Sequence, residues 1–538
     1  MTVASPQVFD VLIVGYGPVG ATLANLLGTR GYRVAVVEQA LNIYDKPRAI
    51  TADQEAMRVF QECGLAEEIS RSTVPHPGTD FVGVEGQVIK RFYPQPQPHP
   101  LAWEPSFMFI QPELEATLRM GVGRFPAIQT LLGHELLGLE QADGKVVATV
   151  RRLEDGSVQT LQALYAVACD GAKSGVRRQL ATEIEDLEFD EWWLVVDGKI
   201  RGRTELPPRC VQYCRPSRPG TYIVGPGELR RWEIKMLPGE SPDDLRDPAT
   251  VRKVLATFVD VDAVELWRIA VYRFHALVAK RWKDGRVFLM GDAAHQMPPF
   301  LGQGLCAGIR DALNLAWKLD AVLRCGLDEH LLDSYGEERE PHVRTVVAHA
   351  RAFGLIIGEL DPDAALARDQ QLGEELAAGR SETVRQKFIP DLTSGLVARD
   401  ANGQPLEGAG TLFVQPWVYT RSGALMRLDD AVPRGFLIAG ASVEVVRWLD
   451  EDSAALWRQL DGSAVVIAAS APASDADCIC LTEREKVFAN WLGALGARAV
   501  LVRPDHYVYG IARNAYELCR LVEQLGQSLN CHRGVSIS

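Results

Sequence analysis

The sequence lacks the features that mark several large classes of protein. Its ten cysteines include no C-x-x-C pair, the usual spacing of a structural zinc site or a dithiol redox centre, so we expect a reduced, cytoplasmic chain without a metal site. Basic residues are not in excess: 57 lysines and arginines stand against 70 aspartates and glutamates, a net charge of −13. A nucleic-acid partner therefore has no electrostatic support.

A long uninterrupted apolar run is also missing near the N-terminus. Asp10 breaks the apolar stretches of the first 28 residues, and no basic region precedes them. We therefore expect no targeting segment, no transmembrane helix and no membrane partner. With 538 residues, 47% hydrophobic and 24% charged, the composition is that of an ordinary globular enzyme of several domains.

The chain opens with the pattern of a βαβ unit. Residues 9–14 (FDVLIV) and 32–37 (YRVAVV) are short runs rich in β-branched residues, and residues 21–31 between them have helical composition. Strand, helix and strand within about 30 residues are the size of such a unit. The sequence therefore predicts a parallel sheet at the start of the chain.

A glycine-rich turn lies between the first strand and the helix. Gly15, Gly17 and Gly20 have the G-x-G-x-x-G spacing, which provides a tight turn, close approach of a pyrophosphate to the backbone and close helix–strand packing. Glu38 ends the second strand, where a carboxylate can accept ribose hydroxyl hydrogens. The pattern predicts a dinucleotide site, although alone it does not separate FAD from NAD and occurs in unrelated βαβ turns.

Two further clusters follow expected strands. Asp170 comes after the buried run 164–168, where an Asp-Gly turn alone would be unremarkable. Gly291 and Asp292 come after the run 287–290, and a proline- and glycine-rich loop then leads into a long helix over 308–323. An acid at a strand end can hold the ribityl chain of a flavin, and such a loop presents N–H groups and a positive helix dipole to the flavin pyrimidine ring. The bland alternative for the loop is a simple helix entry.

These three clusters, in this order and spacing, resemble those of the class A flavoprotein aromatic hydroxylases over about residues 8–380. The segments Lys46–Ile50, Phe109–Leu114, Gly302–Gly304 and Leu315–Leu319 look most like the 3-(3-hydroxyphenyl)propionate hydroxylases, and Val502–Val508 is similar to the C-terminal domain of the phenol hydroxylase branch. The resemblance implies that Arg48 and Gln111 face FAD. The residues expected to contact the cofactor are Gly15, Gly17, Pro18, Val19, Gly20, Glu38, Gln39, Arg48, Gln111, Asp170, Gly291, Asp292, Pro299, Gly302, Gln303, Gly304 and Leu305.

The resemblance also implies an α/β fold with three domains. The expected parts are a Rossmann-like FAD-binding domain (1–180 and 284–390), an antiparallel-sheet substrate domain (181–283, with 76–105 as a possible addition) and a thioredoxin-like C-terminal domain (391–538). Because the C-x-x-C pair is absent, we expect the last domain to be structural or to form a homodimer rather than to exchange electrons.

Two residues are candidates for the chemistry through the same resemblance. Asp53 stands five residues before Arg58, as does the phenol-deprotonating aspartate of the phenol hydroxylases, but an N-cap of the helix expected over 51–64 is an equally good interpretation. Tyr272 is similar to a tyrosine that partners the substrate hydroxyl in those relatives, and a core aromatic is its alternative. His295 is expected to form structural hydrogen bonds only.

The resulting hypothesis is an FAD-dependent monooxygenase of aromatic catabolism. It would use NADH or NADPH and O2 to hydroxylate a phenolic ring ortho to its hydroxyl, with a 3-(3-hydroxyphenyl)propionate-type acid as the first substrate to test. The alternatives are the same chemistry on another aromatic or heteroaromatic compound, such as a polyketide or quinolone, a flavoprotein that does not hydroxylate, or an NAD-dependent dehydrogenase. The second and third clusters disfavour the dehydrogenase.

Overall fold

The computed structural model describes residues 8–380, 382–470 and 478–530, and its chain divides into two compact units. Unit 1 comprises Met1–Gln95, Glu104–Ala312 and Val343–Ile389, and unit 2 comprises Pro96–Trp103, Leu313–His342 and Pro390–Ser538. Among the described helices, none combines the length and the apolar character needed to span a bilayer.

The first sheet of unit 1 is the predicted parallel sheet. Its strand order is β17-β18-β11-β1-β2-β8, with β10 paired to β11 and β9 paired to β10. β1 runs parallel to both β2 and β11, and β18 runs parallel to β11. The strands are β1 (Val8–Val14), β2 (Val34–Glu38), β8 (Ile128–Leu132), β9 (His134–Ala142), β10 (Lys145–Arg152), β11 (Val158–Ala168), β17 (Lys283–Asp284) and β18 (Val287–Leu289).

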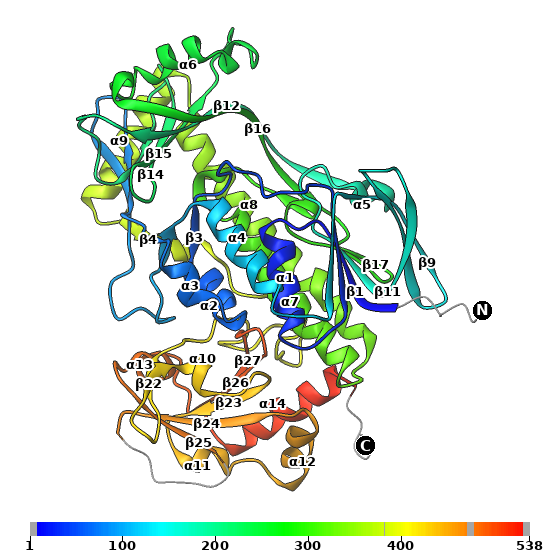
Figure 1. Cartoon of the computed structure of the whole chain (residues 1–538). Coiled ribbons are helices and arrows are strands. Elements are labelled where there is room, and N and C mark those ends of the chain that lie inside the picture. Colours follow the sequence, from blue (N-terminus) through cyan, green and yellow to red (C-terminus); the bar gives the residue numbers. More distant parts are fainter. Residues whose placement is uncertain (1–7, 381, 471–477, 531–538) are drawn as a thin grey trace. The chain divides into compact units, whose positions relative to one another are not determined.

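The central strands of this sheet are apolar without alternation because both faces are covered. Val11, Leu12, Ile13 and Val14 are all buried, as expected for a parallel strand between helical layers. Helix α1 (Pro18–Gly28) follows β1 and packs against α4 (Gln111–Val122) (Figure 1). It begins earlier than the predicted 21–31 because a proline suits the first helical position.

The second sheet of unit 1 has nine strands in the order β19-β16-β12-β15-β14-β13-β5-β6-β20. The antiparallel sheet predicted over residues 181–283 forms its centre, and the long pair β12 and β16 is prominent in Figure 1. Strands β5 and β6 come from the segment 76–105, which was a possible addition to this sheet. The strands are β5 (Thr79–Val82), β6 (Val88–Tyr93), β12 (Ile184–Ile200), β13 (Cys210–Tyr213), β14 (Gly220–Val224), β15 (Leu229–Lys235), β16 (Val264–Ala279), β19 (His295–Gln296) and β20 (Glu382–Val384).

The two faces of this sheet differ in character. Leu194, Val196, Trp232 and Ile234 alternate along β12 and β15 and form an apolar core with residues of α6 (Pro248–Leu255). The neighbouring residues on these strands point to the opposite face, and some of them are charged and also buried. Examples are Asp197, Arg231 and Glu233. A buried charge must be paired or hydrogen-bonded. The partners of these charged residues are therefore described with the candidate site.

The remaining elements of unit 1 are helices and a small sheet. The small sheet has the order β3-β7-β4, and its strand β3 takes the first residues of the helix predicted over 51–64, so that α2 starts at Gln54. The elements are β3 (Thr51–Asp53), β4 (Val74–Pro75), β7 (Ser106–Met108), α2 (Gln54–Glu62), α3 (Ala66–Ser70), α5 (Gly175–Gln179) and α9 (Pro362–Ala377), with α7 (Gly304–Leu323) and α8 (Ser334–Gly358) shared between the units.

Unit 2 is built on a seven-stranded sheet of order β22-β21-β25-β24-β23-β26-β27. β23, β24 and β25 are parallel, whereas β26 and β27 form an antiparallel pair beside β23. Alternating strands and helices were predicted here and are observed. The elements are β21 (Trp417–Tyr419), β22 (Leu425–Arg427), β23 (Leu437–Gly440), β24 (Ser463–Ala468), β25 (Ile479–Glu483), β26 (Ala499–Val502), β27 (Val508–Ala512), α10 (Leu428–Ala431), α11 (Val443–Val446), α12 (Glu451–Gln459), α13 (Val487–Ala494) and α14 (Ala515–Ser528).

Candidate active site

The three sequence clusters meet at one edge of the parallel sheet. Val14 of β1 is in register with Ala168 of β11, and Ala168 is in register with Leu289 of β18. The glycine turn, the loop of Asp170 and the loop of Asp292 therefore follow three adjacent strands at their carboxyl ends. Ligands of open α/β sheets bind at this edge.

The glycine turn has the geometry that its sequence predicts. Gly15 has φ +101°, and a Cβ placed there would lie 2.3 Å from the carbonyl oxygen of Cys169. A Cβ at Gly20 would lie 2.2 Å from the Gly15 carbonyl oxygen, whereas one at Gly17 would meet no atom within 4 Å. The turn is therefore closed by protein at its first and third glycines and open at the second, where Gly17 caps α1 without a side-chain hydrogen bond.

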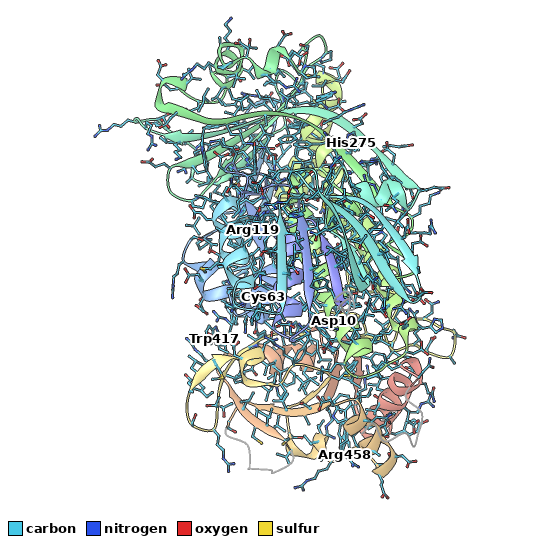
Figure 2. All side chains as sticks on the ribbon, turned by 45° about the vertical axis from the view of Figure 1, so that its right-hand side comes forward. Asp10, Cys63, Arg119, His275, Trp417 and Arg458 are labelled. Carbon is cyan, nitrogen blue, oxygen red and sulfur yellow. The ribbon has the colours of Figure 1, made fainter. Side chains whose placement is uncertain are left out.

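Glu38 and α4 hold this turn from the other side. The Glu38 carboxylate accepts hydrogen bonds from the backbone N–H groups of Tyr16 and Ala40, each at 2.8 Å. The guanidinium of Arg119, labelled in Figure 2, lies 4.6 Å from the centre of the Tyr16 ring. Glu38 thus lies beside the turn, in the position expected of a residue that binds a ribose. Its neighbour Gln39 is exposed.

The second and third clusters are joined by Arg177, which sequence reasoning did not assign to the site. Its guanidinium donates to the carbonyl oxygens of Ala293 at 2.8 Å and Asp292 at 3.3 Å. Asp170 accepts N–H groups of Gly175 and Val176 with Oδ2, and its Oδ1 is buried without a hydrogen-bond partner in the described structure. The Asp292 side chain is exposed, yet the surrounding protein desolvates it enough to raise the pKa of its carboxyl.

The loop before α7 lies against Thr51 of β3, and the first turns of α7 lie against Val19 of α1. Pro299–Leu301 form a turn of 3₁₀ helix that ends at Gly302, whose φ is +64° and whose Cβ, if present, would lie 2.2 Å from Cγ2 of Thr51. One turn into α7, a Cβ at Gly308 would lie 2.6 Å from Cγ2 of Val19. Gln303, Gly304 and Leu305 therefore enter the helix close to the start of α1.

The segment that carries Arg48 is held from two sides. Gln111 Oε1 accepts the backbone N–H of Arg48 at 3.1 Å and of Ala49 at 2.6 Å. From the second sheet, Arg231 donates to the Arg48 carbonyl at 2.7 Å, and Arg231 and Arg268 both donate to the Pro47 carbonyl. Gln111 therefore positions Arg48 through its backbone, and the exposed Arg48 guanidinium lies 5.8 Å from the centre of the Tyr44 ring.

Asp197 is the counter-ion of these two arginines. Its carboxylate contacts Arg231 at 2.7 Å and Arg268 at 3.2 Å, and all three side chains are buried. The same environment desolvates Glu233 and places it near the Asp197 charge, which raises the pKa of Glu233 to about 7. Charged residues that alternate with apolar ones in the run 231–236 were the available signal for this cluster, and sequence reasoning did not use it.

Tyr272 belongs to the same cluster. Its hydroxyl accepts a hydrogen bond from Arg268, and its ring stacks on Phe274 with 6.4 Å between centroids. The side chain is 37% exposed, so it is not the core aromatic that was the alternative interpretation. No described contact joins Tyr272 to Asp53.

Asp53 is buried at the start of α2 and uses both carboxylate oxygens. Oδ1 accepts the backbone N–H of Ala56 at 3.0 Å, which is an N-cap hydrogen bond. Oδ2 pairs with Arg310 of α7, which also contacts Glu55 at 2.6 Å and donates to Gln303 Oε1 at 3.0 Å. Asp53 therefore caps its helix and is also linked, through Arg310, to Gln303 in the glycine loop, by which we mean residues 302–304 before and at the start of α7. Arg310 is a residue that sequence reasoning missed.

His295 makes structural contacts, as expected. Its Nε2 lies 2.9 Å from Oδ2 of Asp311, which also accepts the backbone N–H of Gly291 at 3.2 Å. Its ring stacks on Trp282 with 5.2 Å between centroids. His295 thus helps to fix the loop of Asp292.

These features fit a dinucleotide with a flavin ring. The space at Gly17 and the first turn of α1 suit a pyrophosphate, Glu38 suits a ribose, and the unpartnered Oδ1 of Asp170 can accept a ligand hydroxyl. At the other end, the Gly302 loop opens the 20-residue helix α7, whose positive end suits an electron-rich ring.

Comparison with families of known proteins agrees with this geometry. A family model described as "FAD binding domain" matches residues 8–350, and one described as "HcaD C-terminal domain" matches residues 410–528. The first match covers more than half of the chain. The fold and the site thus define an FAD-binding protein.

Curated relatives match along nearly the whole chain. The 3-(3-hydroxy-phenyl)propionate/3-hydroxycinnamic acid hydroxylase of Burkholderia cenocepacia (strain HI2424) is 36% identical over 512 residues, 93% of each chain. The probable NADH-specific resorcinol 4-hydroxylase of Rhodococcus jostii (strain RHA1) is 33% identical over 524 residues, 97% of this chain and 95% of the relative. The chain belongs to the family of FAD-dependent aromatic hydroxylases, and it is an oxidoreductase.

Solved structures show the same fold. The flavin-dependent monooxygenase PieE in complex with FAD and substrate has a TM-score of 0.81 at 21% identity, covering 98% of this chain and 100% of that one. Aklavinone-11 hydroxylase with FAD and aklavinone has a TM-score of 0.76 at 22% identity, with the same coverage. The mixed α/β fold predicted from the sequence is therefore confirmed.

Proposed function

We propose that this enzyme hydroxylates a phenolic aromatic acid ortho to its hydroxyl, using FAD, O2 and NADH or NADPH. The observation that carries the proposal is the link from the Gly302 loop through Arg310 to Asp53. It places a buried carboxylate beside the loop that suits a flavin ring. The aromatic acid and the resorcinol in the names of the two relatives are both phenols, which supports this substrate class.

We assign the cofactor to the residues that line the sheet edge. Gly15, Gly17 and Gly20 with Pro18 and Val19 would hold the pyrophosphate, and Glu38 and Gln39 the ribose. Arg48, held by Gln111, and Asp170 and Asp292 would contact the middle of the dinucleotide, and the flavin ring would lie on Gly291, Pro299, Gly302, Gln303, Gly304 and Leu305. When bound, FAD supplies the redox chemistry between the nicotinamide, O2 and the aromatic ring.

The chain itself would position the ring and remove the phenol proton. Asp53 is the acceptor that we propose for this proton, because a phenolate ring carbon is more nucleophilic than that of the phenol. Tyr272, on β16 of the second sheet, would donate or accept a hydrogen bond at a substrate oxygen. The covered sheet edge and the buried Arg310 cluster would exclude water from the reacting atoms.

The test begins with the purified protein. We expect a yellow protein that releases all its FAD on acid denaturation, and that oxidises NADH faster with 3-(3-hydroxyphenyl)propionate or resorcinol than with 3-phenylpropionate, which lacks the hydroxyl. The product should carry one added oxygen atom ortho to the original hydroxyl, identified by mass spectrometry and NMR. If no phenol accelerates flavin reduction or yields a hydroxylated product, the proposed function is wrong; turnover only of a larger polyketide or quinolone phenol would overturn the substrate class.

Cofactor assignment can be tested with two aspartates. Asp292→Ala should lower flavin occupancy after purification more than Asp170→Ala. One carboxylate oxygen of Asp170 already accepts backbone hydrogen bonds from the first turn of α5. Equal occupancy in the two variants would contradict our proposal that Asp292 contributes more than Asp170 to holding the cofactor.

For unit 2 we propose a thioredoxin-like arrangement with a structural role, in a homodimer. The parallel strands β23 and β24, the antiparallel pair β26 and β27 and the final helix α14 support this layout. Light scattering coupled to size-exclusion chromatography tests the assembly: a mass of one chain would contradict the dimer.

A further inference from the structure

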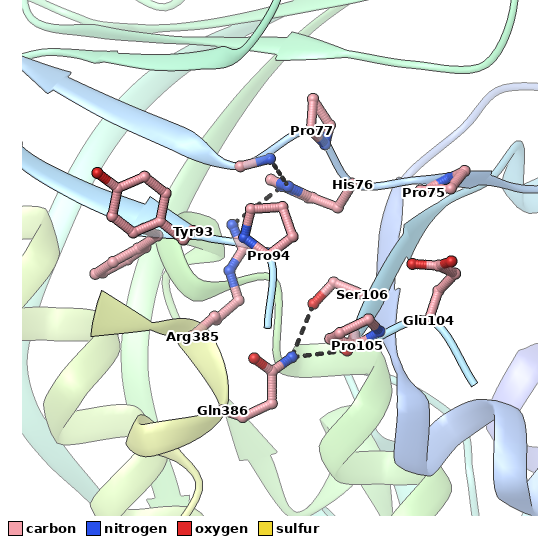
Figure 3. A pocket seen from close by; sticks show the side chains of 12 residues that line it. Pro75, His76, Pro77, Tyr93, Pro94, Glu104, Pro105, Ser106, Arg385 and Gln386 are labelled. Carbon is pink, nitrogen blue, oxygen red and sulfur yellow. Dashed lines mark hydrogen bonds between the residues drawn. The ribbon is translucent and has the colours of Figure 1, made fainter. Parts of the chain in front are cut away.

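A pocket of about 270 Å³ lies in unit 1 between the second sheet and the small sheet. Figure 3 shows its lining, in which His76, Tyr93 and Ser106 come from the strand region and Arg385 from a 3₁₀ turn after β20. The volume is just below the ~300–1,000 Å³ of pockets for drug-sized ligands. It is suited to part or all of a single-ring compound.

Arg385 lines this pocket without a counter-ion. Its Nη2 lies 3.2 Å from His76 Nε2 and 3.4 Å from Thr79 Oγ1, and no carboxylate of the described residues forms an ion pair with it. The surrounding protein desolvates the guanidinium and lowers its pKa. A desolvated cation without an anion is unfavourable, so this arrangement is suited to an anionic ligand.

The acids and bases around Arg385 are committed elsewhere. Arg209 pairs with Asp80 at 3.2 Å, and Asp53, whose charge acts on Arg385, pairs with Arg310. Glu104 also lines the pocket but is exposed, and in Figure 3 it lies on a different side from Arg385. Arg385 is therefore the cation of this lining that a ligand can use.

His76 adds a second donor that lacks an acceptor. Burial and the charges of Arg385 and Arg209 hold its pKa well below the usual value, so the ring is neutral. Its Nδ1 accepts the backbone N–H of Gly78 at 2.9 Å, which leaves the ring proton on Nε2, opposite Nη2 of Arg385. A neutral imidazole has one acceptor nitrogen, so two donors face each other here and an anionic oxygen between them would satisfy both.

We propose that Arg385 and His76 bind the carboxylate of the aromatic substrate; this rests on the proposed function and specifies its substrate class. The charge-assisted pair would contribute to affinity and also to orientation, because a Cβ at Gly302 would lie only 3.3 Å from Arg385 Nη1. The guanidinium therefore touches the loop assigned to the flavin ring. A substrate held at Arg385 would thus lie close to that loop.

The test compares an acid with its neutral analogue. Binding of 3-phenylpropionate and 3-phenylpropionamide to the holoenzyme is measured by calorimetry, since neither compound has a phenol to hydroxylate. We expect the acid to bind about tenfold or more tightly than the amide, the range of a charge-assisted hydrogen-bonded pair. Arg385→Gln should remove most of this preference and Arg385→Lys should restore part of it.

Lys387→Gln is the matched control. Lys387 is exposed in the same 3₁₀ turn, so this variant removes one positive charge without touching the pocket and should keep the preference. If Arg385→Gln does not yield folded holoenzyme, His76→Gln provides the second variant, with a smaller expected loss of preference.

The outcomes separate this inference from the function on which it rests. If the enzyme hydroxylates phenols but binds acid and amide equally, or if the Arg385→Gln holoenzyme keeps the full preference, the carboxylate site is wrong and the proposed function stands. If the acid is preferred through Arg385 but no phenol is hydroxylated, the carboxylate site stands and the proposed function falls.

Discussion

Arg310 on α7 forms a buried ion pair with Asp53 at the start of α2, across 257 residues of sequence. The same guanidinium contacts Glu55 and Gln303. One arginine thus connects the proposed proton acceptor to the glycine loop proposed for the flavin, so a change at Asp53 affects both helix capping and the geometry of the site.

Asp53→Asn should keep FAD but lower the hydroxylated product formed per NADH consumed. Asparagine can still cap α2, and Glu55 still pairs with Arg310, so the stability cost should stay within the ~1.5–3 kcal/mol of a hydrogen bond to a charged group. Loss of a general base costs about 10²–10⁴-fold in rate. Product yield and melting temperature are measured below the pKa of the phenol, and a higher pH should partly rescue the yield.

Asp247→Asn is the control for capping alone. Asp247 caps α6 through the backbone N–H of Thr250, with the same geometry and no link to the site, so its product yield should not change. An unchanged yield in Asp53→Asn at low pH would return Asp53 to a capping role.

Asp197→Asn should destabilise the protein and weaken FAD retention together. The variant removes the carboxylate that pairs with both buried arginines and leaves Arg231 with Glu233, 3.8 Å away. Breaking a buried ion pair costs about 3–5 kcal/mol. Because both arginines bind the backbone of Pro47 or Arg48, the Arg48 segment would also lose its support. Thermal unfolding and flavin occupancy provide the two measurements.

Asp190→Asn on the same sheet provides the comparison. Asp190 is 40% exposed and pairs with Arg273, and exposed pairs contribute only ~0–1 kcal/mol. If both variants lowered stability by similar amounts, the buried cluster would not have the role that we assign to it.

Glu338→Gln should destabilise unit 2. Glu338 contacts Lys318 and Arg503 at 2.7 Å each, with all three side chains buried, and Arg503 also pairs with Asp505 at 2.6 Å. The two cations hold the pKa of Glu338 well below its usual value. We expect a loss of about 3–5 kcal/mol, seen in thermal unfolding, and almost none in the exposed neighbour Glu337→Gln.

The same cluster predicts the effect of removing residues 391–538. This truncation deletes Arg503 and leaves the buried Glu338 paired with one cation, Lys318, where it had two. A truncated chain should therefore unfold at a lower temperature even if it keeps flavin. Unchanged thermal stability would show that the cluster is dispensable.

Glu233→Gln should change how stability depends on pH. The folded-state pKa of Glu233 is raised to about 7 from an ordinary value of 4.5. Its contribution to stability is therefore fully present below about pH 4.5 and is lost as pH rises through 7. The variant should be more stable than the parent at pH 8.5, by on the order of 3 kcal/mol at most.

Melting temperatures of both proteins at pH 5 and pH 8.5 provide the measurement. Glu228 is exposed and directly precedes β15, the strand that carries Glu233. Glu228→Gln should therefore leave the parent's pH profile intact. An identical profile in Glu233→Gln would contradict the raised pKa.

The sequence alone was sufficient for the local elements and for the cofactor motif. The runs before Gly15, Asp170 and Asp292 became the parallel strands β1, β11 and β18, because a continuous apolar run bounded by glycine is compatible with a buried strand. The helix start at Gln54 was displaced from the prediction, since pairing of Thr51–Asp53 with β7 overrode local helical periodicity.

The ion pairs between residues distant in sequence could not be predicted from the sequence. Asp197 with Arg231 and Arg268, and Asp53 with Arg310, join residues whose separation along the chain carries no periodic signal.

The sequence by itself therefore determined the βαβ turn and its dinucleotide motif, because glycines at fixed spacing and an acid at a strand end act through local backbone geometry. Only the tertiary structure decided which charges are paired and which are left for a ligand. Nothing in the sequence distinguishes the roles of Arg209 and Arg385. In the folded chain, the Asp80 carboxylate lies beside Arg209, and a pocket lies beside Arg385. Pairing depends on distances in space, and those distances are set by how the sheets pack.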